Sequence, residues 1–285
     1  MIISTQCLVC HSTESKIIYS GRLIKCLGCG FVTANLDRNR IDPEWIYSEE
    51  YFRGEEYLDY VGDKKIIQKN FGRRIRYIID NIDVESFTSV LEIGCAYGFF
   101  GEMIRHHFPG TTYLGLDIAE KPIKYAGEIL NLDTLKIDYL DFRSKENYTD
   151  VFMWDVIEHL LRPDLVVEKI HSELKSNGRL YITTGDIGAV IPRIRKAKWR
   201  HIHPPTHLNH FSSETLTKLL ESRGFRITKI SYPFIYRGLK QIFYSLFLLG
   251  KNPWKVVRTI FNHIPGEIYL PLNTFDTMFV IAVRQ

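Results

Sequence analysis

The feature that most restricts the fold of this 285-residue chain is an alternation of apolar strands and amphipathic helices from residue 63 onward. A helix is predicted over 64–82, where Ile67, Phe71, Ile75 and Ile78 recur at steps of three and four residues. Seven apolar strands are then expected, with helices between most of them, at 89–94, 111–117, 133–138, 149–155, 178–184, 225–232 and 275–285. This alternation predicts an α/β, Rossmann-like domain, whose seven-stranded, mostly parallel sheet carries helices on both faces.

Small and acidic residues gather where the first two predicted strands end. The first strand runs into "LEIGCAYGFF", in which Glu92 precedes three small residues, Gly94, Ala96 and Gly98. Small residues let the backbone turn sharply and approach a ligand just before a helix begins. The second strand ends at Asp117, whose carboxylate can accept hydrogen bonds from both hydroxyls of a ribose. Sheets of this kind bind ligands outside the carboxyl ends of their strands, so we expect a nucleotide-type ligand there.

This succession of motifs resembles the class I S-adenosylmethionine-dependent methyltransferases over about residues 63–285. In that family the acidic, glycine-rich loop wraps the methionine and ribose of the cofactor, and the acid after the second strand holds the ribose. The acid after the third strand caps the adenine, and the segment after the fourth strand lies against the methionine. The resemblance therefore implies cofactor contacts at Glu92, Gly94, Cys95, Ala96, Gly98, Asp117, Ile118, Asp138, Tyr139, Asp155 and Val156.

Other interpretations of these residues stay open. Ala96 stands where glycine is commoner in the family, and we expect an altered loop fit without loss of binding. Asp117 can be a helix cap, and Asp138 can be a loop carboxylate without a ligand. Cys95 fits a small packing residue better than a nucleophile. A nicotinamide enzyme is the competing cofactor hypothesis, but the third glycine of the dinucleotide fingerprint is missing and "DVIEHL" follows the fourth strand.

Four of the five cysteines form two Cys-x-x-Cys pairs near the N-terminus: Cys7 with Cys10, and Cys26 with Cys29. Two such turns across a short hairpin can complete a tetrahedron of thiolates around Zn²⁺. Because four protein ligands close the site, the predicted zinc is structural, in a ribbon over residues 1–35. Disulfides or free thiols are the alternative, and disulfides would require an oxidising compartment.

Two further segments are longer than the fold requires. Residues 36–62 are rich in tyrosine and acidic residues, and they are predicted either to form part of an active-site lid or to be an ordered linker. Residues 238–264 are apolar and basic, and we expect a helical insertion before the last strand. That insertion can cover the acceptor pocket, dimerise or rest on a membrane surface, and packing against protein is the preferred interpretation.

Histidines are the predicted catalytic groups. "WRHIHPPTHLNH" places four of the chain's ten histidines at 201, 203, 207 and 210, in the loop after the fifth predicted strand. This loop lies on the acceptor side, and imidazole titrates near neutrality, so general-base work is favoured. His207 is the first choice, His203 the second, and His159, which follows Glu158, is next. A metal site is the less favoured alternative because no carboxylate lies in the stretch and Pro204-Pro205 predicts an extended backbone.

Five basic residues just before the histidines would suit an anionic acceptor or form a solvated face: Arg193, Arg195, Lys196, Lys198 and Arg200. The combination of cysteine ribbon, "YSEEYFRGEEY", methyltransferase core and "P-x-H-L-x-x-F-S-x-x-T-L" is similar to bacterial sugar and surface-polysaccharide methyltransferases. This resemblance implies O-methylation of a sugar, nucleotide-sugar or glycan-type acceptor. The alternatives are sugar C-methylation, a ribosomal RNA methyltransferase, and a zinc-ribbon interaction protein with a vestigial cofactor pocket.

Composition agrees with an ordinary globular protein of the cytoplasm. The chain has 25% charged residues and a formal net charge of +4, which is too mild to indicate nucleic-acid binding by itself. No apolar run reaches the length of a membrane span, and the N-terminus lacks the pattern of a signal peptide. A cytoplasmic location is therefore expected, with cysteines kept reduced.

Overall fold

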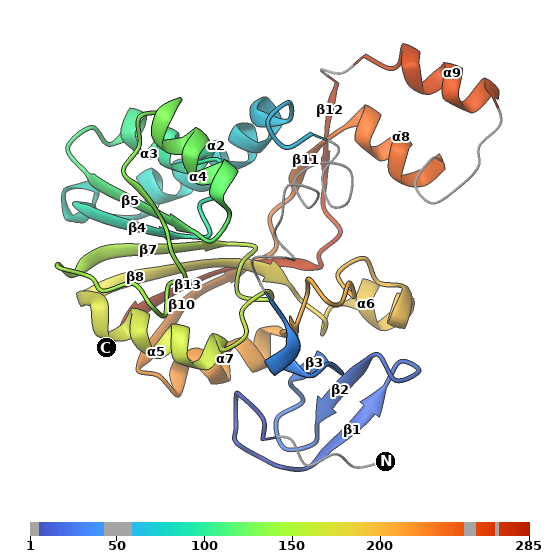
Figure 1. Ribbon diagram of the computed structural model, residues 1–285, viewed down its shortest axis with the longest axis horizontal. Coiled ribbons are helices and arrows are strands. Elements are labelled where there is room, and N and C mark those ends of the chain that lie inside the picture. The colour runs from blue at the N-terminus through green and yellow to red at the C-terminus, as the bar shows by residue number, and fades with distance from the viewer. Residues whose placement is uncertain (1–5, 43–58, 248–254, 266–267) are drawn as a thin grey trace.

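One seven-stranded sheet forms the centre of the protein (Figure 1). The computed structural model describes residues 6–42, 59–247, 255–265 and 268–285. The strand order is β10-β13-β8-β7-β4-β5-β6, and the strands from β8 to β6 are parallel to their neighbours. β13 runs antiparallel to both β8 and β10. The predicted α/β fold, with a seven-stranded and mostly parallel sheet, is therefore confirmed.

The elements of this domain alternate along the chain as the apolar pattern predicts. The strands of the sheet are β4 (Ser89–Ile93), β5 (Thr112–Asp117), β6 (Thr134–Lys136), β7 (Tyr148–Trp154), β8 (Leu174–Gly185), β10 (Phe225–Ser231) and β13 (Thr277–Arg284). The main helices are α2 (Lys64–Asn81), α3 (Phe99–His107), α4 (Glu120–Glu128), α5 (Pro163–Glu173) and α7 (Ser213–Glu221). Ser212 caps α7 through a capping box with Thr215.

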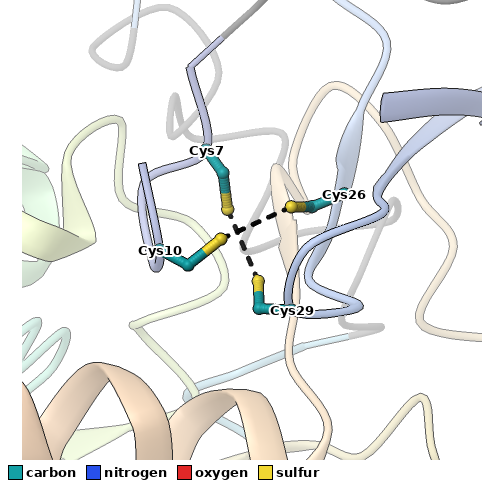
Figure 2. A group of neighbouring side chains, drawn as sticks. All are labelled: Cys7, Cys10, Cys26 and Cys29. Atoms are coloured by element: carbon teal, nitrogen blue, oxygen red, sulfur yellow. Dashed lines mark hydrogen bonds between the residues drawn. The ribbon is translucent and has the colours of Figure 1, made fainter. Parts of the chain in front are cut away.

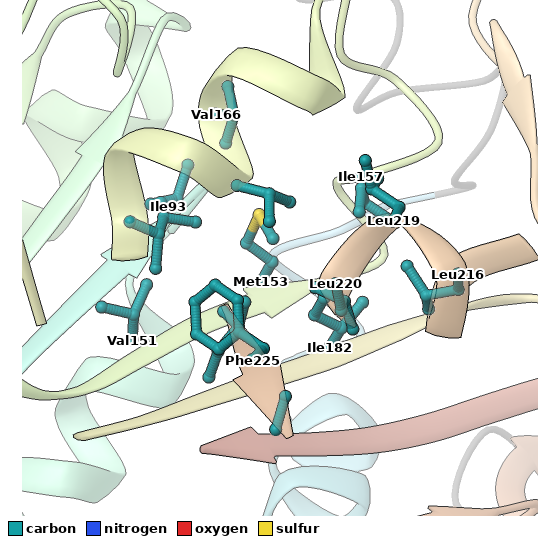
Figure 3. Close-up of a cluster of buried hydrophobic side chains, with 14 of the residues drawn as sticks. Ile93, Val151, Met153, Ile157, Val166, Ile182, Leu216, Leu219, Leu220 and Phe225 are labelled. Atoms are coloured by element: carbon teal, nitrogen blue, oxygen red, sulfur yellow. The ribbon is translucent and has the colours of Figure 1, made fainter. Parts of the chain in front are cut away.

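Alternate side chains of each central strand enter two separate hydrophobic cores. On β7, Val151 and Met153 pack beneath α5 and α7, whereas Phe152 and Trp154 pack beneath α2 and α3. The two helix layers lie on opposite faces of the sheet in Figure 1, and Figure 3 shows the core on the α5 and α7 side. Since strand residues point alternately to the two faces, strands that are apolar at nearly every position must be covered on both faces.

The N-terminal module is a hairpin sheet that includes a strand from the main domain. β1 (Ser15–Ile18), β2 (Leu23–Cys26) and β3 (Val32–Ala34) pair antiparallel in sequence order. The fourth strand, β9 (Asn209–His210), comes from the histidine-rich segment and pairs antiparallel with β3. The module is therefore joined by backbone hydrogen bonds to the segment in which the sequence predicts the catalytic histidines.

A pair of helices is joined to the main domain through a two-stranded antiparallel ribbon. β11 (Ile235–Gly238) and β12 (Tyr269–Leu272) pair antiparallel, and α8 (Leu239–Phe247) and α9 (Lys255–His263) lie between them. The helices extend away from the central sheet in Figure 1. Most of the predicted lid or linker, residues 43–58, lies outside the described residues. Within the part of the chain that is described, none of the helices has the length and hydropathy needed to cross a bilayer.

The segment between β8 and α7 is more structured than the predicted loop. It contains α6 (Val190–Arg195), a short 3-10 turn (Lys196–Lys198) and β9. The expected extended backbone at Pro204-Pro205 is wrong, because the chain turns there and the peptide bond between the two prolines is cis. The hydroxyl of Thr206 donates to the carbonyl of His203 across this turn at 2.7 Å.

Candidate active site

The loop after β4 adopts the backbone that its small residues permit. Gly94 and Gly98 have φ of 73° and 72°, in the left-handed region that favours glycine. A methyl group at Gly94 would lie 2.5 Å from Cγ2 of Val156, so the loop also packs too closely against the segment after β7 to accept a side chain there. Ala96 also has a positive φ, 46°, which explains why glycine is the commoner residue in the family at this position.

Asp117 links this loop to the helix that follows β5. Its carboxylate accepts hydrogen bonds from the backbone N–H of Ala96 at 2.8 Å and of Ala119 at 2.9 Å. Asp117 also lines a cavity that extends from this loop to the histidine-rich segment. Burial raises the pKa of Asp117, while these two N–H groups act in the opposite direction. Glu92 is 2% exposed and accepts from the hydroxyl of Tyr113. Burial raises the pKa of Glu92 to about 8.

The predicted cofactor residues after β5, β6 and β7 line the same cavity, but they differ in burial and in their hydrogen-bond partners. Asp138 is exposed and accepts from the N–H of Leu140 at 2.8 Å. Tyr139 is buried and its hydroxyl donates to Glu173 of α5, so its ring packs against α5 while the residue still lines the cavity. Ile118, Asp155 and Val156 line the cavity as well.

Cys95 lies at the floor of the loop. It is 4% exposed, and a methyl group on Gly115 of β5 would lie 2.8 Å from its sulfur. Burial raises the pKa of the Cys95 thiol, which keeps it protonated. This environment agrees with the interpretation of Cys95 as a packing residue, not a nucleophile.

A single cavity of about 650 Å³ extends from the cofactor loop to the histidine-rich segment. At one end lie Glu92, Gly94 and Asp117. At the other end lie Glu158, His159, Arg200, His201, His207 and residues of β11. A volume of this size accommodates a small-molecule ligand of the size of a cofactor together with part of an acceptor.

The rings of His207 and His159 pack against each other at this second end of the cavity. Their ring centroids are 4.7 Å apart and the rings are perpendicular, with an interplanar angle of 86°. Nδ1 of His207 donates to the carbonyl of His201, and Nδ1 of His159 donates to the carbonyl of Thr206, both at 2.9 Å. Since a carbonyl can only accept, Nδ1 carries a proton in both rings.

The other histidines of this segment have different surroundings. His203 is exposed and does not line the cavity, and its Nδ1 lies 2.9 Å from the hydroxyl oxygen of Thr206. The structure therefore gives no support to His203 as second choice. His201 lines the cavity beside Trp199, with ring centroids 4.8 Å apart. His210 is 3% exposed and lies in β9 at the junction with the N-terminal module.

Backbone hydrogen bonds explain why segments about fifty residues apart meet here. The N–H groups of Leu208 and Asn209 both donate to the carbonyl of Glu158, at 2.8 and 2.9 Å. The side-chain amide of Asn209 donates to the carbonyl of Leu160 at 2.7 Å. These bonds fix the histidine-rich segment against the turn after β7, so His207 and His159 are held in place by the backbone.

Arg38, which sequence analysis did not identify, ties the N-terminal module to both of these segments. Its guanidinium donates to the carbonyl of Leu161 at 2.7 Å and to the side chain of Asn209 at 2.8 Å. It also donates to the carbonyl of Leu208 and to the hydroxyl of Thr33. Burial lowers the pKa of Arg38 to about 10, which leaves it charged at neutral pH.

Arg74 of α2 is a second cavity residue that sequence analysis did not identify. Its guanidinium carbon lies 4.6 Å from the centre of the Trp154 ring. Burial lowers the pKa of Arg74, while the negative charge of Asp155 acts in the opposite direction. A signal was present in the sequence, because Arg74 falls three residues after Phe71 on the apolar face of the predicted helix. Arg74 and Asp155 both line the cavity.

The basic run before the histidines is mostly turned to solvent. Arg193, Arg195, Lys196 and Lys198 are exposed and do not line the cavity. Arg200 does line it, and its guanidinium pairs with Asp276 at 3.0 Å.

The four cysteines of the N-terminal module converge as a metal site requires (Figure 2). Sγ of Cys7 lies 3.6 Å from that of Cys29, and Sγ of Cys10 lies 3.6 Å from that of Cys26. A tetrahedral Zn²⁺ with bonds of about 2.3 Å separates its sulfurs by about 3.8 Å. All four cysteines are free of disulfides, and their sulfurs lie within 4.8 Å of one another. The thiolate set therefore fits zinc in both chemistry and spacing.

Comparison with known proteins agrees with the fold and the cofactor loop. A family model described as a methyltransferase domain matches residues 57–230, more than half of the chain. The chain belongs to this methyltransferase family. The fold and relatives that are named methyltransferases agree with this membership. Membership of this family gives no support to the nicotinamide enzyme, the competing cofactor hypothesis.

Relatives of the chain include O-methyltransferases that match part of it. The ubiquinone biosynthesis O-methyltransferase of Pelagibacter ubique is 27% identical over 146 residues, which is 46% of this chain and 60% of that protein. A malonyl-[acyl-carrier protein] O-methyltransferase of Ilyobacter polytropus is 26% identical over 43% of this chain and 54% of its own length. The chain thus spans about 60% or less of the length of these relatives.

Solved structures with this fold cover more of the chain. A S-adenosylmethionine-dependent methyltransferase from Archaeoglobus fulgidus has a TM-score of 0.52 and 24% identity, covering 85% of this chain and all of that one. Magnesium protoporphyrin IX methyltransferase from Synechocystis, determined with bound S-adenosylhomocysteine, has a TM-score of 0.52 and 14% identity, covering 83% and 97%. At these identities the similarity shows the fold.

Proposed function

We propose that the protein methylates a hydroxyl oxygen of a small acceptor of the sugar, nucleotide-sugar or glycan type. The observation that carries this proposal is the cavity, which joins the cofactor loop to the imidazoles of His159 and His207. Relatives named O-methyltransferases support oxygen as the acceptor atom. The sugar-type acceptor rests on the resemblance of the sequence motifs, and Arg200 and Arg237 in the cavity wall suit an acceptor that carries negative charge.

Methyl transfer from a sulfonium is an in-line displacement that requires little from the protein beyond position and a proton acceptor. The cofactor loop would hold the sulfonium, while the acceptor oxygen would lie about 3–3.5 Å from the methyl carbon. An alcohol must lose its proton, and His207 is the proposed base or acceptor-binding group, with His159 next to it. Burial, together with His159 and His201 nearby, lowers the pKa of His207, so its imidazole is neutral at physiological pH.

The proposal is tested by transfer of a labelled methyl group from S-adenosylmethionine to defined acceptors. Nucleotide-sugars and glycan end groups are expected to become labelled at oxygen, while phenols and ribosomal RNA serve as the competing classes. His207→Ala is expected to lower turnover at least about 100-fold with unchanged cofactor affinity, because a positioned base typically contributes that much. Label found only in RNA or only in phenols would refute the sugar-type acceptor, and label on carbon would refute O-methylation.

We also propose that the four cysteines hold one structural zinc ion. The sulfur spacing fits the ion, and the N-terminal module is too small to be stable through a hydrophobic core alone. Zinc there would keep β3 in place as the partner of β9, and thereby support the histidine-rich segment. Protein purified without chelator should contain this zinc by elemental analysis, and Cys26→Ser should lose it.

A further inference from the structure

The helix α6, between β8 and the histidine-rich segment, exposes aliphatic side chains that lie outside the core. Ile191 packs against the buried cluster that contains Trp199, and it thereby anchors the helix to the protein. Val190 and Ile194 are four residues apart, so they share a face of the helix, and they are 70% and 73% exposed. Among the described residues, no other large apolar side chain is as exposed as these two.

Basic side chains accompany this aliphatic face. Arg193, Arg195, Lys196 and Lys198 are all exposed, and none of them forms an ion pair within the part of the chain that the structure describes. The sequence from 187 to 213 contains no aspartate or glutamate, so no acidic neighbour along the chain offsets these charges. We call the following residues the α6 patch: Val190, Arg193, Ile194, Arg195, Lys196 and Lys198.

Aliphatic side chains next to several cations fit the surface of an anionic lipid bilayer. Apolar side chains of such an element enter the boundary between headgroups and acyl chains, while arginine and lysine attract the lipid phosphates. Nucleic acid is another polyanion, but surfaces that bind single strands present aromatic rings on which bases stack. The α6 patch contains no aromatic residue, and the nearby Trp199 is 2% exposed. The combination therefore favours lipid.

We propose that the protein docks through the α6 patch on the surface of an anionic lipid bilayer. This inference does not rest on the proposed methyl transfer, because the patch lies outside the cavity. Arg200 and His201, which line the cavity, follow Lys198 within three residues of the chain. Docking through the patch would therefore hold this end of the cavity close to the bilayer.

The helix pair α8 and α9 has the same chemical character. Tyr244 of α8 lines the same cavity, and its ring centroid lies 6.0 Å from that of Phe261 of α9. On α9, Val256 and Ile260 are 65% and 49% exposed. The sequence from 239 to 266 contains four basic residues and no acidic one. In Figure 1, α6 and this helix pair both lie to the right of the central sheet. A second element that joins the cavity thus agrees with an anionic and apolar partner.

The test measures binding of the full chain to vesicles by co-sedimentation. Vesicles with equal parts of phosphatidylglycerol and phosphatidylcholine are compared with vesicles of phosphatidylcholine alone. We expect the anionic vesicles to bind at least about tenfold more tightly, because each cation near an anionic surface adds attraction. Since salt screens exposed charges, this binding should weaken as the ionic strength is raised.

Two variants separate the charged from the aliphatic contribution. The double variant Arg193→Gln with Arg195→Gln is expected to bind anionic vesicles on the order of 10- to 30-fold more weakly, because two cations are lost. Ile194→Gln retains every charge and is expected to bind about tenfold more weakly, because an aliphatic group no longer enters the bilayer. All three side chains are exposed, so binding of S-adenosylhomocysteine and the circular dichroism spectrum should match those of wild type.

Each variant has a matched control elsewhere on the surface. Lys175→Gln with Arg226→Gln also removes two exposed cations, but these lie near the starts of β8 and β10, whereas α6 follows the end of β8. Ile129→Gln replaces an aliphatic side chain that is 65% exposed at the end of α4. Both controls should bind anionic vesicles as tightly as wild type does.

Three results would overturn the docking surface. Equal binding to the two kinds of vesicle would exclude anionic lipid as the partner. Wild-type binding by Ile194→Gln would show a bare basic run that attracts any polyanion. Binding to a single-stranded oligonucleotide that the double arginine variant loses, without binding to vesicles, would assign the patch to nucleic acid. Loss of labelled methyl transfer with vesicle binding retained would instead refute only the proposed function, so the two failures are distinguishable.

Discussion

Asp117 shows how much one side chain contributes to the shape of the cofactor site. Its carboxylate accepts from the N–H of Ala96 in the loop after β4 and from the N–H of Ala119 before α4. The same side chain lines the cavity, where the resemblance to class I methyltransferases assigns it to the ribose. The helix-cap interpretation of Asp117 is wrong, because Ala119 is the N-cap of α4 and no side chain caps this helix. The carboxylate instead binds the backbone N–H groups of Ala96 and Ala119 and still lines the cavity.

Replacing Asp117 by asparagine is expected to weaken cofactor binding by about 1.5–3 kcal/mol, the range for hydrogen bonds to a charged group. That corresponds to on the order of 10- to 150-fold in affinity. Isothermal titration calorimetry with S-adenosylhomocysteine measures it, and Asp133→Asn, an exposed carboxylate outside the cavity, is the control. An affinity equal to that of wild type would show that the ribose is held elsewhere.

Among the structural elements, β9 has the largest influence on the site for its size. It has only two residues, yet it pairs with β3 of the N-terminal module and begins two residues after His207. Arg38 reinforces this junction, because its guanidinium donates to Leu161 on one side and to Asn209 on the other. The N-terminal module therefore acts on the active site by holding the two segments that carry its imidazoles.

Replacing Arg38 by methionine is expected to destabilise the protein by about 2–4 kcal/mol, because buried carbonyls lose a charged donor. Turnover should fall, since His207 and His159 are no longer held together, while the dissociation constant of the cofactor stays near its wild-type value. Chemical denaturation and steady-state kinetics measure the two effects.

Arg40→Met is the matched control for this variant, because Arg40 lies in the same turn, is 84% exposed and pairs only with Asp37 among the described residues. Arg38→Lys separates charge from geometry, since a lysine cannot reach both segments at once. If Arg38→Met lost stability but retained full turnover, the junction would be structural only.

The regular elements could be predicted from the sequence because their signals are local. The apolar period of three and four residues in α2 and the apolar runs of β4, β7 and β8 depend on neighbouring residues only. The Cys-x-x-Cys pairs and the loop after β4 are local patterns in the same sense.

What the sequence could not show depends on distant partners. β9 is too short to have a pattern of its own, and it exists because β3 lies some 175 residues earlier in the chain. Glu158 comes from the turn after β7, about fifty residues before the histidine-rich stretch, so its position beside His159 and His207 could not be predicted from the sequence. The turn at Pro204-Pro205 likewise depends on its surroundings, because a proline pair favours an extended backbone by itself.

At the scale of the whole molecule, buried side chains of the N-terminal module belong to the hydrophobic core of the main domain. Cys7, Cys26 and Phe31 of the module belong to the same buried cluster as Met153 and Phe211 of the main domain. The rings of Phe31 and Phe211 lie 5.0 Å apart. Because the two parts share a core and a sheet, we expect them to unfold together, and groups buried at the junction to affect the stability of the entire protein.

His210 makes this global stability depend on pH. Burial, followed by the nearby charges of Arg22 and Arg38, lowers the pKa of His210 to about 3. In the unfolded chain its pKa is about 6.5. Between these two pKa values the unfolded state therefore binds a proton that the folded state does not bind. The contribution of neutral His210 to the free energy of unfolding is complete above the unfolded pKa, and it is lost progressively as the pH falls toward the folded pKa. At pH 5 the loss is on the order of 2 kcal/mol from this histidine.

His210→Gln removes this titration while retaining a neutral polar side chain. We expect the free energy of unfolding to fall less steeply between pH 6.5 and pH 4 in the variant, with a slope difference approaching about 1.4 kcal/mol per pH unit, which is one proton. Urea denaturation at several pH values measures both slopes. The cysteine thiolates and the other buried histidines are present in both proteins, so their contributions cancel in the difference. Parallel curves for the two proteins would mean that His210 is protonated in the folded state and that the junction opens to water around it.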